Sequence, residues 1–205
     1  NAENCLIVMI EKWRKCLEQG VVCSGLLTDL SKAFDSLPHN LLIAKIHAYG
    51  FDMPSVRLIY SYLTNCTQRV KISDSYSQWS KILYCVTQGS ILGPLLFNIF
   101  LSGFYLFIPK TEIANYADDN TPYTTGKDTE TILKDLKGAS LILMNWFEIN
   151  FMKANPDKYH LIVSNDENTN LKIGNSHIAN SKCEKLLGIK IDNKLSFEAN
   201  VESFG

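Results

Sequence analysis

The sequence predicts an α+β fold, with helices packed on one face of an antiparallel sheet. Two observations predict it. Apolar residues recur at helical spacing in several separate stretches, and short apolar runs bounded by turn residues lie between and after them. No internal repeat, low-complexity tract or linker divides the 205 residues, so one continuous domain is expected.

The first part of the chain is expected to hold three helices and one buried strand. Apolar side chains spaced along 6–18 predict an amphipathic helix. The Val- and Leu-rich run 21–30 predicts a buried strand that ends at about Asp29. Pro38 opens a second helix and Asp52 a third. A carboxylate is therefore expected at a strand end.

The middle of the chain is expected to alternate strands and a helix. Residues 67–73 and 78–86 predict two strands joined by a polar turn. An apolar helix is expected over 92–107, and a hairpin over 112–123 with Asp118-Asp119 at its tip.

The last part is expected to start with a helix and continue as short strands. Asp128 is placed to cap the helix, whose apolar positions form one face. Strands are expected over 160–164, 171–173 and 185–191, separated by Asn-, Asp- and Gly-bearing turns. The residues expected to be buried on the helix are Ile132, Leu133, Leu136, Leu143 and Phe147.

Composition and charge bear on three classes of protein: nucleic-acid binders, zinc or disulfide-rich proteins, and membrane proteins. With 20 Lys and Arg against 21 Asp and Glu, the net charge is −1, so no global basic field indicates a nucleic-acid binder. The six cysteines form no C-x-x-C pair and no His lies at zinc-finger spacing, so neither a zinc module nor a disulfide framework is indicated. A reducing intracellular compartment, nuclear or cytoplasmic, is expected. The uncharged stretch 82–109 is interrupted by polar residues and glycines, so a buried strand-turn-helix is expected there instead of a membrane span.

Three aspartates carry the first chemical hypothesis. Asp118 and Asp119 are adjacent, and alone they would be read as a solvated turn. Asp29 ends another predicted strand, and two adjacent strands of one sheet would bring the carboxylates together. Such a cluster of hard oxygen ligands suits a pair of Mg²⁺ ions.

Five ordered motifs resemble the reverse transcriptases of non-LTR retrotransposons, of the jockey and CR type. Thr28–His39 resembles their first palm motif, Val86–Phe97 the second and Tyr116–Asp119 the signature hairpin. Asn155–Lys158 resembles the fourth motif, and 187–197 resembles the fifth with the entry to the thumb. The second motif departs from the family in having Thr87 where Pro is usual.

This resemblance implies an RNA-directed DNA polymerase with two Mg²⁺ ions, or Mn²⁺ in their place, acting on an RNA template, a DNA primer and dNTPs. Asp29 and Asp118 would bind both metals, with Asp119 and the Leu30 carbonyl completing the site. Lys158 would protonate the leaving pyrophosphate.

Three further residues are expected at the nucleotide. The resemblance implies that the ring of Phe34 would exclude a 2′-hydroxyl, whereas sequence alone favours Phe34 as a core residue. Gln88 and Gly89 would let the backbone approach the template base and the nucleotide.

The resemblance also implies a domain plan. Residues 1–205 would be a reverse transcriptase fragment, with a palm at 21–165, part of the fingers at 37–86 and palm–thumb junction strands at 166–205. The remaining fingers and thumb would belong to a longer parent chain. Two alternatives stay open: an inactive retroelement relic with at most weak nucleic-acid binding, and an RNA-dependent RNA polymerase, which Phe34 disfavours.

Overall fold

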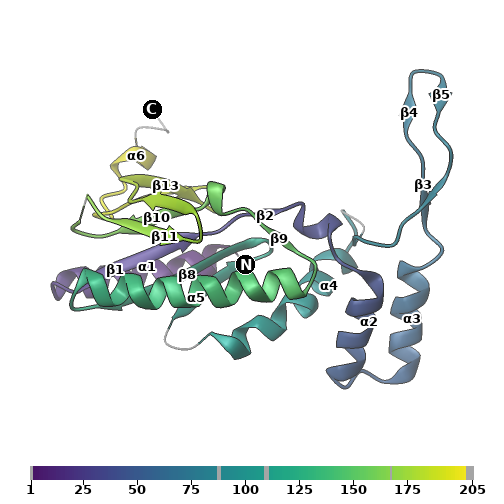
Figure 1. The fold of residues 1–205 in the computed structure, drawn as a ribbon, viewed down its shortest axis with the longest axis horizontal. Helices are drawn as coiled ribbons and strands as arrows, with labels where there is room; N and C mark the ends of the chain where they lie inside the picture. The colour runs from purple at the N-terminus through teal and green to yellow at the C-terminus, as the bar shows by residue number, and fades with distance from the viewer. Residues whose placement is uncertain (1, 87–88, 109–110, 167, 202–205) are drawn as a thin grey trace.

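A four-stranded antiparallel sheet forms the centre of the molecule, in a computed structural model that describes residues 2–86, 89–108, 111–166 and 168–201. The strand order is β10-β1-β8-β7 (Figure 1). The mixture of this sheet with helices confirms the α+β class. The strands are β1 (Val22–Leu27), β7 (Glu112–Tyr116), β8 (Asp119–Gly126) and β10 (His160–Val163).

Helices cover both faces of this sheet, which differs from the expectation of one covered face. Helix α5 (Thr129–Ile149) packs on one face, where Leu26 of β1 joins the apolar cluster of α5. Helix α1 (Ala2–Glu18) packs on the other, where the Trp13 ring lies so close to Gly25 that a Cβ there would come within 2.9 Å. Since alternate residues of β1 point to opposite faces, β1 is buried on both sides.

The pairing of β1 with β8 is interrupted once. β8 is an internal strand, yet it contains Pro122, which has no N–H to donate to a neighbour. The ladder runs from Val22 to Gly25 of β1, stops opposite Pro122, and resumes as a single bridge between Thr28 and Asn120. The bridge therefore holds the end of the sheet where the aspartates lie.

A second apolar cluster lies beside the sheet, among α2 (His39–Ala48), α3 (Met53–Leu63) and α4 (Leu92–Leu101). The helix expected over 92–107 continues only to Leu101, after which a 3₁₀ segment, η2, covers Ser102–Phe107. Within the described ranges, no helix combines the length and apolarity that crossing a bilayer requires.

A β-hairpin arm, residues 66–82, projects away from the body beyond α2 and α3 (Figure 1). The two strands expected here are present only as short paired segments, and 82–86 is not a strand. The segments are β3 (Thr67–Gln68) with β6 (Ser80–Lys81), and β4 (Lys71–Ile72) with β5 (Ser75–Tyr76).

The C-terminal part forms two further hairpins. One joins β11 (Asn170–Ile173) to β12 (Ser176–Ala179) and the other joins β13 (Cys183–Leu186) to β14 (Ile189–Asp192). The single strand predicted over 185–191 was wrong, because Leu187 and Gly188 adopt φ values of 49° and 91° and form a tight turn. The remaining short elements are β2 (Leu30–Ser31), η1 (Ala33–Asp35), β9 (Lys153–Ala154), η3 (Pro156–Lys158) and α6 (Glu198–Val201).

Candidate active site

The three aspartates lie at one end of the sheet, where β1 ends and the β7–β8 hairpin turns. Asp29 directly follows the Thr28–Asn120 bridge. The hairpin turn is formed by Ala117 and Asp118, one residue earlier than predicted, because Asp119 already pairs with Tyr116. Ala117 takes the strained left-handed conformation, φ 55°, that so short a connection requires.

A cavity of about 230 Å³ opens between this end of the sheet and β13. Asp29 and Asp119 both line it, together with Lys158, so the structure brings together three of the four predicted catalytic residues. The Lys158 ammonium pairs with the Asp29 carboxylate, with 3.5 Å between Nζ and Oδ2. Asp118 is adjacent in the chain but does not line the cavity.

The carboxylates repel one another. The pKa of the Asp119 carboxyl is raised, first by partial desolvation and then by the negative charges of Asp118 and Asp29. A cation placed among these groups would relieve the repulsion, and carboxylate oxygens are the ligands that Mg²⁺ prefers. The donor type and the charge thus fit a divalent metal.

The carboxylates are not yet gathered closely enough to form a complete metal site, however. Among the described residues, no three His, Cys, Asp or Glu side chains are gathered at a spacing that would hold a metal ion. At Asp29, the Lys158 ammonium supplies the positive charge. The carboxylates would therefore have to draw together around a metal.

Replacing Asp119 by Asn should stabilise the fold at neutral pH, because it removes a charge that folding places near two others. Since the pKa of Asp119 is raised in the folded state, its charged form lowers the free energy of unfolding. This destabilisation is present above the folded-state pKa and disappears as pH falls through it. We expect the melting temperature to rise by about 1–2 °C at pH 7, with no gain at pH 3. Asp74→Asn, in the exposed turn of the arm, is the control and should change neither value. A lower melting temperature for Asp119→Asn at pH 7 would contradict the repulsion.

Two asparagines fix the turn that carries Asp118. Asn120 is completely buried, and its Nδ2 donates to the Asp118 carbonyl at 2.9 Å. Its Oδ1 accepts from Asn115 Nδ2 at 2.7 Å, and its backbone carbonyl accepts from both the N–H and the hydroxyl of Thr28. Asn120 therefore links the chain just before Asp29 to the turn that carries Asp118. Sequence reasoning missed this role, although Asn115 and Asn120 flank the Tyr-Ala-Asp-Asp motif and form a cross-strand pair.

Of the predicted nucleotide-binding residues that the structure describes, none lines the aspartate cavity. Phe34 is half-buried, stacks on Phe97 with 4.3 Å between ring centroids, and lines a cavity of about 470 Å³ with Ala117 of the hairpin. Leu30 lies in β2 with its side chain buried. Gln88, like Thr87, lies outside the described residues.

Gly89 has a backbone reason to be glycine. Its φ is +79°, which side-chain-bearing residues rarely adopt, and a Cβ there would meet nothing within 4 Å. Among the residues that the structure describes, none would crowd a side chain at this position.

Two further side chains of the aspartate cavity were missed by the sequence analysis. His160 and Lys185 both line it. His160 Nδ1 lies 2.9 Å from Glu184 Oε1 of β13, which ties β10 to the β13–β14 hairpin. No motif connects these residues in the sequence, since only the fold brings the hairpin over the sheet.

This arrangement of sheet and helices, with aspartates at one end of the sheet, is that of a polymerase palm, and solved structures share the fold. The apo telomerase of Candida tropicalis truncated from its C-terminal domain matches with a TM-score of 0.68 at 16% identity, covering 97% of this chain and 39% of that one. Telomerase of Candida albicans, solved with the TWJ fragment of telomeric RNA, matches with a TM-score of 0.68 at 13% identity, covering 96% and 34%. At these identities the likeness shows the fold alone, and the predicted palm is confirmed.

The chain belongs to the reverse transcriptase (RNA-dependent DNA polymerase) family, whose model matches residues 7–191. Two similar relatives come from Drosophila melanogaster. The probable RNA-directed DNA polymerase from transposon BS is 26% identical over 193 residues, covering 88% of this chain and 21% of the relative. The RNA-directed DNA polymerase from mobile element jockey is 27% identical over 198 residues, covering 91% and 21%. The chain thus spans about a fifth of these relatives, and the resemblance to non-LTR retrotransposon reverse transcriptases is confirmed.

Proposed function

We propose that this chain is the palm-centred part of an RNA-directed DNA polymerase that extends a DNA primer on an RNA template with dNTPs. The observation that carries the proposal is the gathering of Asp29, Asp119 and Lys158 around one cavity, with Asp118 in the adjoining turn. Family membership over residues 7–191 supports the same reaction.

The metal site would be formed by the carboxylates of Asp29, Asp118 and Asp119, with the Leu30 carbonyl as a further oxygen ligand. Two Mg²⁺ ions, or Mn²⁺, would activate the primer 3′-hydroxyl and neutralise the triphosphate. Lys158 lies within reach of this site, since its ammonium pairs with Asp29. Released from that pair, it would donate a proton to the leaving pyrophosphate.

Two nitrogen-bearing side chains of the cavity would hold the primer. Lys185 of β13 and His160 of β10 line the same cavity as Asp29 and Asp119. Lysine ammonium groups bind phosphate oxygens as point charges, and His160 can donate a hydrogen bond. These two residues are therefore suited to the terminal phosphates of a primer whose 3′-hydroxyl meets the carboxylates.

Phe34 would select deoxynucleotides. Its stacking on Phe97 supports its inner face, and its position in the cavity with Ala117 places it beside the turn that carries Asp118. A rigidly supported ring is suited to exclude a 2′-hydroxyl. Both readings of Phe34, gate and core, are compatible with this half-buried position.

Replacing Phe34 by Val should therefore raise the use of rNTPs relative to dNTPs by at least about tenfold, since steric exclusion of one small group is worth ~1–3 kcal/mol. Single-nucleotide incorporation with each substrate would measure the ratio, and Phe51→Val, at an exposed position, serves as control. An unchanged ratio with reduced thermal stability would leave Phe34 only its packing role.

The domain plan is part of the proposal. The sheet with α5 supports a palm over 21–165, and α2, α3 and the arm, which lie beside the sheet in Figure 1, support partial fingers over 37–86. The hairpins after residue 166 would form the palm–thumb junction. Further fingers and thumb segments would come from a longer parent chain.

The test is Mg²⁺-dependent extension of a DNA primer on an RNA template, by this chain and by a version extended with related fingers and thumb. Extension that requires the carboxylates would support the polymerase. If an extended version folds and binds the template but does not extend the primer, an inactive relic that retains only nucleic-acid binding would be favoured instead.

A further inference from the structure

The β-hairpin arm, residues 66–82, carries an exposed stack of cations and aromatic rings that the proposed catalysis does not use. The Arg69 guanidinium lies 3.9 Å from the ring centroid of Tyr76 and 4.6 Å from that of Trp79. The Lys71 ammonium lies 5.5 Å from the Tyr76 ring on the same arm. Cation–π contacts of this kind order both partners, so the rings are held in place without burial.

The two strands of the arm are paired with unequal spacing, and this bends the hairpin at the stack. Two residues, Arg69 and Val70, separate β3 from β4 on one strand, whereas three, 77–79, separate β5 from β6 on the other. Such unequal spacing bends a hairpin and re-aims its side chains. Val70 N–H donates to Ser77 Oγ and the Ser77 N–H donates back to the Val70 carbonyl, which fixes the bend.

The rings stay open to solvent although apolar burial would be favourable. Trp79 is 62% exposed and Tyr76 is 50% exposed, and neither belongs to an apolar cluster of the body. The arm carries three cations, Arg69, Lys71 and Lys81, against one carboxylate, Asp74, whereas the whole chain has a net charge of −1. Positive charge is thus concentrated on the element that also exposes rings, which is the combination that single-stranded nucleic acids require.

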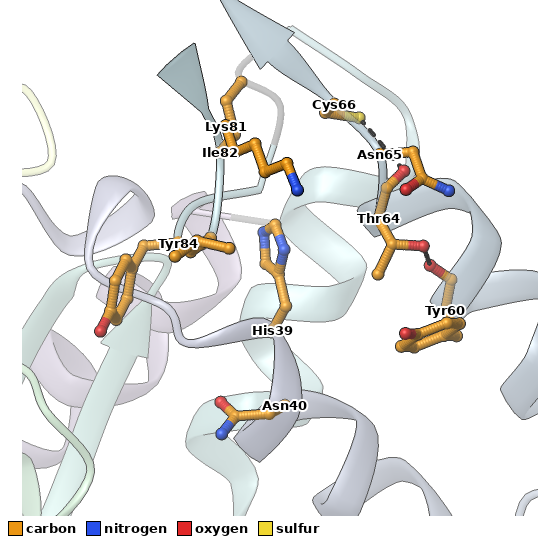
Figure 2. A pocket seen from close by; sticks show the side chains of 10 residues that line it. His39, Asn40, Tyr60, Thr64, Asn65, Cys66, Lys81, Ile82 and Tyr84 are labelled. Atoms are coloured by element: carbon orange, nitrogen blue, oxygen red, sulfur yellow. Dashed lines mark hydrogen bonds between the residues drawn. The ribbon is translucent and has the colours of Figure 1, made fainter.

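The surface continues at the base of the arm into a cavity of about 430 Å³. Figure 2 shows the His39 ring at its centre, facing the Lys81 side chain, with Tyr60 and Thr64 on the opposite wall. This volume lies within the range of small-ligand sites, and the lining offers hydrogen-bond donors beside an aromatic ring. A strand bound along the arm would therefore meet further polar groups at its base.

We propose that the arm binds single-stranded nucleic acid, with unpaired bases stacking on Trp79 and Tyr76 and phosphates meeting Lys71 and Lys81. A duplex keeps its bases stacked on one another, so only an unpaired strand can use these rings. The inference relies on the family's nucleic-acid substrates but not on the metal site, and its test is run without metal.

Trp79 supplies a direct readout. Of the three tryptophans, Trp13 and Trp146 are buried, so a change in tryptophan fluorescence on adding a short oligo(dT) strand in EDTA reports on the arm. We expect saturable quenching in the unmodified chain and in Asp118→Asn, and its loss in Trp79→Leu. Quenching that persists in Trp79→Leu would overturn the proposal.

Affinity is measured by anisotropy of the labelled strand. The double substitution Arg69→Ala with Trp79→Leu should weaken binding of oligo(dT) by at least about tenfold and that of a blunt duplex by less than about twofold. Arg14→Ala with Phe107→Leu likewise removes one arginine and one aromatic ring, at exposed sites outside the arm, and should leave both affinities unchanged. Trp79→Phe keeps a ring and should retain affinity for the strand.

Salt dependence tests the phosphate contacts. Lys71→Gln and Lys81→Gln should each reduce the slope of log affinity against log salt by about 0.7 for the single strand. The proposal is overturned if the double substitution leaves oligo(dT) binding unchanged, or if it weakens strand and duplex equally. Because Asp118→Asn should bind the strand normally, failure of this proposal is distinguishable from failure of the catalytic one.

Discussion

Replacing Asp118 by Asn is expected to lower Mg²⁺-dependent primer extension by at least about a thousandfold in the extended protein. An amide cannot supply the negative charge that a shared metal site needs, and metal stabilisation is worth several kcal/mol, where each ~1.4 kcal/mol is a factor of ten in rate. The fold should survive. The turn is held through the Asp118 backbone carbonyl, which accepts from Asn120, and Asn has the same shape as Asp.

Direct metal binding separates this effect from misfolding. Mn²⁺ titration followed by electron paramagnetic resonance should show weaker binding in Asp118→Asn, while its melting temperature stays close to that of the unmodified chain. Asp135→Asn, on helix α5 rather than at the end of the sheet, is the matched control for loss of one carboxylate. Extension at the normal rate in Asp118→Asn would remove this residue from the metal site.

The second large effect is expected for Asn120→Ala. The substitution leaves the backbone bonds to Thr28 in place but removes the partner of the Asp118 carbonyl and one of the two acceptors of Asn115 Nδ2, which also donates to the Ala117 carbonyl. Loss of these two bonds in the part-buried turn costs about 1–3 kcal/mol of unfolding free energy. Activity should fall further than folding explains, by about a hundredfold, because a displacement of the turn by ~1 Å would misplace a carboxylate of the proposed metal site.

Asn150→Ala distinguishes positioning from stability. Asn150 is also buried, and its Nδ2 donates to the Trp146 carbonyl at 2.7 Å at the end of α5. Its replacement should lower the unfolding free energy while the kcat of the folded fraction stays unchanged. Denaturant unfolding and extension kinetics on both variants make the comparison. If Asn120→Ala keeps its kcat, the asparagine link serves only the fold.

Local signals predicted the helices well. Asp52 and Asp128 each accept a hydrogen bond from an N–H three residues later, so the third predicted helix and α5 start where a capping aspartate indicates. Turn positions were less predictable. The residues of the Leu187–Gly188 turn have positive φ values that depend on hairpin pairing, and an apolar run across them resembles one strand.

The residues of the candidate site were likewise predictable only in part. Asp29 and Asp119 meet because they lie at the same end of adjacent strands, which the sequence pattern indicated. His160 and Lys185 join them only because the β13–β14 hairpin packs over the sheet, and no local pattern encodes that contact. The cover on the second face by α1 likewise depends on the fit of the Trp13 ring against Gly25, which spacing alone does not reveal.

The proline within β8 divides the pairing of β1 with β8 into two parts. Since no ladder bond is donated at Pro122, opening of the pairing beyond it need not propagate to the part that α1 and Trp13 hold. Amide protons near Thr28 and Asn120 should then exchange with solvent through a local opening that costs less free energy than global unfolding. Those near Cys23 should exchange only when the core unfolds. The end of the sheet that carries the aspartates can therefore rearrange without lowering the stability of the whole domain.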